Sequence, residues 1–497
     1  MLYFITRKGM ILKMKKELKK FIAVCLTAVF ALSLCSCGGG EESGDTTIIW
    51  YMRKPVGDMS HQQMVEDAAN EIIEKELGCK IHFEFIDSGS WNEKINVIIQ
   101  SGEEFDIIND SGINFYENVA KNAYIDIADM IEKYGPDIKA KNDDFVWDAV
   151  TVDGKIMAVP SNNFSVPYQS YAFKKDLIDK YNIDYENIKT IEDFDAALDI
   201  IHQNEPGIYP VLATANTTIP YPLSTKFIVT STTGVLFDVD NDKFIPEVEA
   251  KYFDDRYRKA NEYFVKGYIP KDAATKTETV SEIKSGKYFA FSGRRSAVKT
   301  SNLYGFECVE SEPMYGLINT SNVAAGLNAI SRTSKHPELA VQVLNLIWKD
   351  PDLSNLLAYG IENVDYTVVS GEGQEKSVLP KSGNEVKWSI WHNWLGPLWD
   401  QWDSSWNSKE SLIEMQELNR SAEVAPILGF VPDLSAYKTN IAMINSIFTE
   451  SIPVLSTGSM PDYDEYVTAL KSRYKDAGID DVVDEINKQY KEWKSKK

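Results

Sequence analysis

The chain has 497 residues, too many for one simple core, so two or more folded lobes are expected. Its formal net charge of −22 argues against nucleic acid and anionic lipid headgroups as partners, because like charges repel. The five cysteines and five histidines are scattered without a zinc-ligand spacing, so neither a metal nor a cofactor is predicted. Cys79 and Cys308 are left as either one disulfide or two buried thiols.

The N-terminus has the pattern of a lipoprotein signal peptide. Four lysines between Lys15 and Lys20 precede the apolar run 21–34, which is short for a membrane span. The run ends in Leu34-Cys35-Ser36-Cys37, which matches a lipobox with Cys37 as the lipidated residue. We therefore predict a signal peptide over 1–37 with Met14 as its start, and a lipid anchor on the extracellular face of the cytoplasmic membrane. The alternative is a cleaved secretory signal with an incidental cysteine.

A glycine-rich polar tether, 38–45, separates this signal from a regular pattern of strands and helices. Apolar runs and helical spacing alternate in a β-α-β-α-β order, over 46–51, 64–77, 80–86, 91–100 and 105–108. This order predicts a parallel sheet flanked by helices, which binds ligands beyond the carboxyl ends of its strands. Asp87, Asn109 and Asp110 follow two of these strands and are candidate ligand-binding residues; ordinary turn chemistry is the alternative.

Further along, 152–160 predicts a hairpin, and 161–171 a crossing between lobes with Tyr168 near the cleft. Arg294 ends an apolar run and could fork onto hydroxyl groups, although a position in a surface pair with Arg295 is the favoured interpretation. Glu362 is a similar candidate.

An acidic stretch in the middle of the chain fits a calcium-loop template in part. Asp238, Asp240, Asp242 and Glu249 occupy four ligand positions, but Lys243 replaces the required glycine. A hairpin turn is therefore expected there. Helices are predicted over 252–266 and 337–348, and two more over 462–497, separated near Gly478.

Six of the eleven tryptophans lie between Val386 and Asn407. Trp399, Trp402 and Trp406 have the i, i+3, i+7 spacing of one helical face, which predicts a structural role. Trp391 and Trp394 precede the Gly396-Pro397 break in an irregular segment, where binding residues are common. These two are candidate platforms for the face of a flat ligand, with simple packing as the alternative.

The chain resembles the extracellular solute-binding proteins of bacterial ABC importers, in particular the LplA-type lipoproteins with a C-terminal DUF3502 domain. The matching stretches run through the chain: Ser101-Gly102-Glu103, Phe105-Asp106, Gly154-Lys155, Ala158-Val159-Pro160, Ile330 to Glu338, Tyr359 to Glu362, Leu428-Gly429-Phe430, and Ala477-Gly478-Ile479 through Gln489 and Trp493.

The resemblance implies an α/β fold: a two-lobed, type II-like clamshell with mainly parallel sheets flanked by helices and a helical C-terminal region. By analogy, 46–160 and 322–370 form the first lobe, and 165–320 and 371–497 the second. It also implies a monomer that takes a carbohydrate, most simply an oligosaccharide, to permease subunits in the membrane without catalysis. The alternatives are a cell-attached glycoside hydrolase, which needs two facing carboxylates, and a surface adhesin without a ligand cleft.

Overall fold

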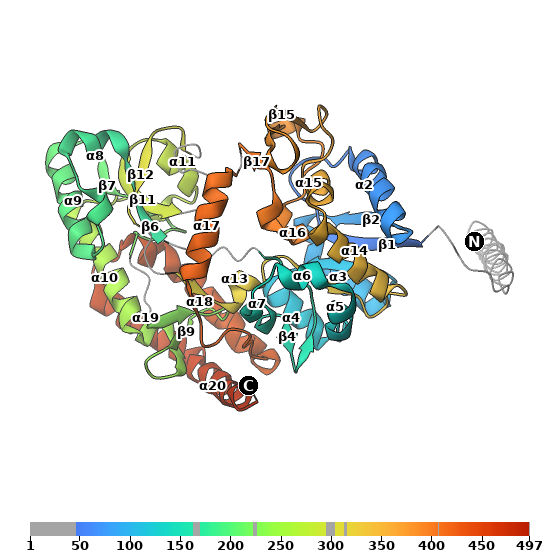
Figure 1. Cartoon of the computed structure of the whole chain (residues 1–497). Coiled ribbons are helices and arrows are strands. Elements are labelled where there is room, and N and C mark those ends of the chain that lie inside the picture. Colours follow the sequence, from blue (N-terminus) through green and yellow to red (C-terminus); the bar gives the residue numbers. More distant parts are fainter. Residues whose placement is uncertain are drawn as a thin grey trace, which may run out of the picture. The chain divides into compact units, whose positions relative to one another are not determined.

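The computed structural model describes residues 46–162, 169–221, 226–294, 304–312, 316–405 and 407–496. Within these ranges the chain is α/β, with sheets flanked by helices (Figure 1). Of the helices in these ranges, none has the length and apolar character that crossing a bilayer requires.

The first sheet has the strand order β14-β3-β1-β2. The parallel pair β1 and β3 is the predicted core of this sheet, and β14 adds an antiparallel edge. Strands and helices follow the predicted order, with bounds β1 (Thr46–Arg53), α2 (Gln62–Leu77), β2 (Cys79–Ile86), α3 (Trp91–Ser101), β3 (Ile107–Asp110), α4 (Gly112–Ala120), β14 (Leu327–Ile330), α14 (Pro337–Lys349) and α15 (Pro351–Tyr359).

Alternation along β1 builds a core on each face of this sheet. Ile48, Trp50 and Met52 belong to one buried cluster with α2 and α14, whereas Tyr51 belongs to a second cluster with α3 and α4. Successive side chains of a strand point to opposite faces, so a run of apolar residues can serve two helical layers. β3 begins two residues later than predicted, because the Asp106 carboxylate accepts a hydrogen bond from the Ile49 amide (2.9 Å).

A second sheet, ordered β12-β6-β11-β7, is mixed. β6 runs antiparallel to both neighbours, and only β11 and β7 are parallel, so the parallel arrangement expected of the fold is confined here to one pair. Its core is packed by α8, α9 and α10. The bounds are β6 (Gln169–Lys174), α8 (Lys175–Tyr181), α9 (Ile191–Asn204), β7 (Tyr209–Val211), α10 (Lys251–Lys266), β11 (Tyr288–Arg294) and β12 (Cys308–Glu310).

The C-terminal helices α18 (Lys438–Thr457), α19 (Tyr463–Asp476) and α20 (Ile479–Lys494) share one buried cluster with the small sheet β10-β9-β8, whose edge strand β8 is Phe227–Val229. The predicted pair of tail helices is confirmed, with Gly478 left-handed between them (φ 78°). α10 joins this cluster to the second sheet, since Phe253 and Tyr257 lie in one core and Ala260 and Tyr263 in the other.

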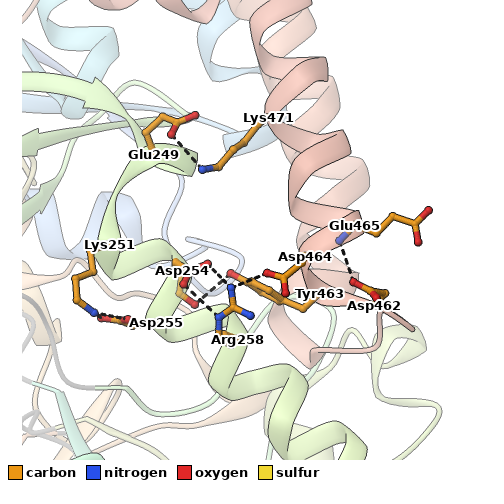
Figure 2. Close-up of polar contacts among 10 residues, drawn as sticks. All are labelled: Glu249, Lys251, Asp254, Asp255, Arg258, Asp462, Tyr463, Asp464, Glu465 and Lys471. Carbon is orange, nitrogen blue, oxygen red and sulfur yellow. Dashed lines mark hydrogen bonds and ion pairs between the residues drawn. The ribbon is translucent and has the colours of Figure 1, made fainter.

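Polar contacts add to this packing on the surface of α10. Figure 2 shows Arg258 between two carboxylates, Asp254 (3.1 Å) and Asp464 of α19 (2.8 Å). The guanidinium also lies 4.3 Å from the ring centre of Tyr463, whose hydroxyl donates to the Asp254 carbonyl. Exposed ion pairs contribute little singly, so these contacts orient α19 while the apolar core supplies most of the stability.

The segment 371–404 differs from its expected grouping with the second lobe. Val378, Trp388, Leu395 and Trp402 belong to the same buried cluster as β1 and α14. The reason is aromatic packing: Trp402 stacks on Tyr359 of α15, with ring centres 5.9 Å apart and nearly parallel planes. The chain therefore leaves the first core only after β17 (Asp403–Ser404), through α17 (Lys409–Ser421).

The acidic stretch is a hairpin, as expected. β9 (Val235–Asp238) and β10 (Lys243–Pro246) pair antiparallel, and Asp242 takes the left-handed turn conformation. Lys226 pairs with Asp240 (2.6 Å) and Lys494 with Asp242 (2.6 Å), so lysine side chains neutralise these carboxylates. Cys79 and Cys308 do not form a disulfide; they belong to different clusters of the protein.

We predict that Gly458→Ala lowers the stability of the protein more than Gly78→Ala. Both glycines end helices with φ near 70°, where any side chain adds about 1 kcal/mol of strain. A Cβ at Gly458 would also lie 2.2 Å from the Ala260 backbone, whereas the space beside Gly78 is open.

The expected loss is therefore at least about 3 kcal/mol for Gly458→Ala and about 1 kcal/mol for Gly78→Ala. Urea unfolding followed by tryptophan fluorescence measures both. Equal losses would contradict the close packing of α18 on α10.

Candidate functional site

The tryptophan-rich stretch supplies both core and surface residues. Trp388 is buried, and its indole N–H donates to the Leu357 carbonyl (2.8 Å). Trp391 is 49% exposed and is the one exposed tryptophan of the described chain. Trp394 is half-buried against the first core, 4.9 Å from Trp391 between ring centres, with the planes tilted by 53°. The two candidate platforms are therefore adjacent, and one presents its ring to solvent.

The predicted helix over Trp399–Trp406 is wrong. The chain instead forms a short 3-10 turn, Leu398–Asp400, and then β17. The cause is Asn355, whose side-chain carbonyl accepts from the Trp402 amide (3.0 Å), while its NH₂ donates to the Asp400 carbonyl (2.9 Å). Trp402 is buried, as its predicted structural role requires; Trp399 is half-buried, and Trp406 lies outside the described residues.

Buried asparagines hold the tryptophan loop, residues 388–402, against the first sheet. Asn109, at the end of β3, and Asn328, on β14, both donate to the Trp394 carbonyl, at 3.0 and 2.9 Å. Asn109 also donates to the Asn328 side-chain carbonyl (3.0 Å). On the far side of the loop, the side-chain oxygen of Asn162 accepts from the Leu398 backbone amide (2.8 Å). The backbone amide of Asn162 donates to the Gly396 carbonyl (3.1 Å). An irregular buried segment needs such partners for its backbone groups.

Two glycines permit this close approach. A Cβ at Gly326 would lie 2.5 Å from the Asn393 carbonyl oxygen, and one at Gly396 would lie 2.4 Å from the Trp348 indole nitrogen. Gly396 also has φ 122°, a conformation that other residues rarely adopt. The loop is thus fixed by contacts at both ends of its short helix, α16 (His392–Leu395).

Asp110 is fully buried at the end of β3. Its carboxylate accepts from the Tyr124 hydroxyl (2.6 Å), the Asn118 side chain (2.9 Å) and the Ser111 amide (2.9 Å). Burial, and secondly the neighbouring Asp110 charge, raises the pKa of Tyr124 well above its usual value, so the phenol stays protonated. Asn109 and Asp110 therefore both have hydrogen-bond partners inside the protein. This suits a structural role at the ends of the strands better than direct contact with a ligand.

Arg53 lies at the same strand ends and was missed by the sequence analysis. It donates to Ser111 (3.2 Å), and its guanidinium lies 4.6 Å from the ring centre of Trp91. Burial lowers the pKa of Arg53, and the charge of Asp110 opposes that effect. The signal was its position as the last residue of β1, directly before a break in the strand pattern.

The other candidates are dispersed. Asp87 is exposed after the edge strand β2, and Glu362 is exposed and paired with Lys376 (3.6 Å). Arg294 ends β11, with its side chain outside the described part, and Tyr168 and Cys37 lie outside the described residues altogether. No described group of three or more His, Cys, Asp or Glu side chains is arranged to hold a metal ion. Ligand contact by these residues stays a prediction.

The chain is similar to known proteins in both sequence and fold. The family model described as "Bacterial extracellular solute-binding protein" matches residues 61–347, more than half of the chain, and the domain of unknown function DUF3502 matches 426–495. A "Carbohydrate ABC transporter substrate-binding protein" of Streptococcus pneumoniae is 28% identical, over 97% of this chain and 100% of its own length.

Among solved structures, the N-glycan transport solute-binding protein of S. pneumoniae matches with a TM-score of 0.77 at 24% identity, covering 91% of this chain and 100% of that one. A solute-binding protein of Bifidobacterium longum subsp. infantis matches with a TM-score of 0.61 at 16% identity, covering 91% and 99%. At these identities, the structures establish the two-domain fold.

We predict that His392 makes the protein less stable as the pH falls from 7 to 5. Burial lowers the pKa of His392 to about 3, against 6.5 for an exposed imidazole. Between these values the unfolded chain binds a proton that the folded chain does not, so stability falls with pH, by about 2 kcal/mol between pH 7 and pH 5.

His392→Gln should remove this part of the pH dependence, as measured by urea unfolding at the two pH values. His336→Gln, at an exposed histidine, is the control and should leave the dependence unchanged. If His392→Gln kept the full slope, the imidazole would not be buried in its neutral form.

Proposed function

Because the chain belongs to the family of bacterial extracellular solute-binding proteins, we propose that it captures a neutral oligosaccharide outside the cell and delivers it to an ABC permease. The observation that carries this proposal is the exposed Trp391 beside Trp394 on a loop that buried amides hold in place. No bond is broken in this function; the protein binds, encloses and releases its ligand.

The chemistry of sugars favours this kind of platform. A pyranose has an apolar face of C–H groups, which stacks on an indole, and an equator of hydroxyl groups, which needs planar polar partners. A tryptophan whose backbone is fixed by hydrogen bonds loses little conformational entropy when a ligand binds. More of the contact energy then contributes to affinity. The excess of negative charge in the chain suits a neutral ligand better than a polyanion.

The relatives support the ligand class. The names of the similar proteins state carbohydrate for the S. pneumoniae relative, Man1GlcNAc and Man5GlcNAc for the N-glycan transport protein, and kestose for a more distant S. pneumoniae binding protein. Each of these named sugars consists of two or more linked, uncharged rings, whereas the linkages between the rings differ. We therefore propose an oligosaccharide, with Trp391 and Trp394 as stacking residues and Tyr168 and Arg294 as further predicted contacts.

We also propose a membrane-anchored lipoprotein that acts as a monomer. The basic stretch, the apolar run and Cys37 are the basis for the anchor, and 38–45 would be the tether. The proposed lobes are 46–160 with 322–404, and 165–320 with the C-terminal region from α17 onward. This grouping follows the buried clusters and replaces the expected boundary at 370.

The first test is calorimetry of the mature protein against a carbohydrate panel of Man1GlcNAc, Man5GlcNAc, kestose and maltotriose. We expect at least one member to bind with micromolar or lower Kd, and Trp391→Ala to weaken it by about 10- to 100-fold, since the stacking face is lost. Trp391→Phe should retain most of the affinity.

Trp493→Ala, at a half-buried tryptophan of the C-terminal helices, is the control and should bind as the unaltered protein does. Reducing ends measured in the same mixtures should not increase; their appearance would favour the glycoside hydrolase. Absence of heat with every member of the carbohydrate panel would count against the proposed function.

The second test concerns the anchor. Cys37→Ala should release the protein from bacterial cells into the medium and abolish labelling by an alkyne-tagged fatty acid, because no thiol remains at the lipobox position. Cys35→Ala should keep both the label and the cell attachment. Equal release of the two variants would contradict Cys37 as the lipidated residue.

A further inference from the structure

The first sheet has two edge strands, and the protein closes them in different ways. At β14 the main chain closes the edge: the amides of Val159 and Asn328 each donate to the carbonyl of the other residue, both at 2.9 Å. β2 lies at the opposite edge, and within the described ranges no strand pairs with its outer side. An open edge presents unpaired N–H and C=O groups, which can pair with a strand of another molecule.

Helix α2 lies beside β2 (Figure 1), and its side chains bond the outward main-chain groups of the strand. The side-chain oxygen of Asn70 accepts from the Ile81 amide (2.7 Å), and its NH₂ donates to the Ile81 carbonyl (3.1 Å). At Phe83, Glu66 accepts from the amide (2.8 Å) and Gln62 donates to the carbonyl (2.6 Å). α2 thus satisfies the amide and carbonyl of alternate residues, as a neighbouring strand would.

The spacing of these α2 residues follows the helical repeat. Gln62, Glu66 and Asn70 lie four positions apart, so they form one stripe along the helix. The adjacent stripe is apolar and belongs to the first core, and it consists of Val65, Ala69 and Ile73. One face of α2 therefore packs on the sheet, while the next face reaches over its edge.

Glu66 connects the polar stripe into one network. Its carboxylate also accepts from the Gln62 side chain (2.8 Å) and lies 3.0 Å from Nδ1 of His82, and the residue is 3% exposed. A buried carboxylate is unfavourable unless several donors replace its lost hydration. Packing alone would not require such a residue, whereas satisfying the main chain of an edge strand does.

We propose that this stripe, the α2 edge cap (Gln62, Glu66 and Asn70), keeps the protein monomeric by blocking strand addition at β2. The partner that it excludes is a second copy of this chain, whose β2 has the same outward groups. Two identical edges can pair about a two-fold axis, so the cap removes both halves of such an interface. This inference is independent of the proposed ligand, so its failure would leave the proposed function standing.

The experiment compares the mature protein with its Asn70→Ala variant. The substitution leaves the amide and carbonyl of Ile81 without a side-chain partner, so amide hydrogens in the peptide 79–86 should exchange at least about tenfold faster. In sedimentation velocity, the unaltered protein should stay monomeric, whereas the variant should form dimers or larger species as its concentration rises. In those species the peptide 79–86 should again be protected from exchange.

Asn70→Asp keeps the acceptor for the Ile81 amide and loses the donor to the carbonyl, so it should associate less than Asn70→Ala. It also decides the question by the same measurements if Asn70→Ala does not fold. Gln63→Ala is the matched control on the same helix, because Gln63 is exposed and its side chain donates to Asp67 (2.8 Å) rather than to β2. This control should remain monomeric with unchanged exchange.

Gly458→Ala, measured below its unfolding transition, separates the edge from a general loss of stability, and it should remain monomeric. Association of Gly458→Ala to the same extent as Asn70→Ala would overturn the proposal. A monomeric Asn70→Ala at every concentration would also overturn it, whatever the exchange rate. So would association that leaves the peptide 79–86 unprotected, because another surface would then form the interface.

Discussion

The structure depends on one constraint: an irregular loop that is buried beside a sheet must find partners for its backbone groups. Four asparagines supply them, Asn109, Asn162, Asn328 and Asn355, each less than a tenth exposed. An amide side chain both donates and accepts, so one residue can tie a loop to a strand without burying a charge. Because the Trp394 carbonyl is held by Asn109 and Asn328, the neighbouring Trp391 can be exposed and still have a fixed place.

This constraint also explains why some of the clustered tryptophans are buried and others lie nearer the surface. Trp388 and Trp402 point into the first core, where their contacts with α15 fix the loop on its buried side. Trp391 directly precedes α16, Trp394 lies within it, and Trp399 lies in the turn beyond Gly396. A single stretch of chain therefore contributes buried tryptophans to the first core and one exposed tryptophan to the surface. Rigid support of this kind limits the entropy lost when a flexible, hydroxyl-rich ligand binds.

The C-terminal helices are built into the protein rather than appended to it. α10 contributes Phe253 and Tyr257 to the core they share with the small sheet, and Ala260 and Tyr263 to the core of the second sheet. The ion pairs of Arg258 with Asp254 and Asp464 align α19 on the outside of this packing. Since both cores use the same helix, the family domain at 426–495 and the second sheet are expected to move as one body.

The sequence by itself determined the elements and the fold class, because apolar periodicity is a local property of the chain. The β-α-β-α-β order, the break at Gly478 and the left-handed turn near Asp242 follow from residue types that act on their own neighbours. Only the tertiary structure decided the contacts of Trp402 and Arg53, and showed that 371–404 joins the first core. Those outcomes depend on partners far away in the chain, such as Asn355 for Trp402 and Ser111 for Arg53. Spacing along a sequence does not encode such contacts, since they form only when the folded backbone brings the segments together.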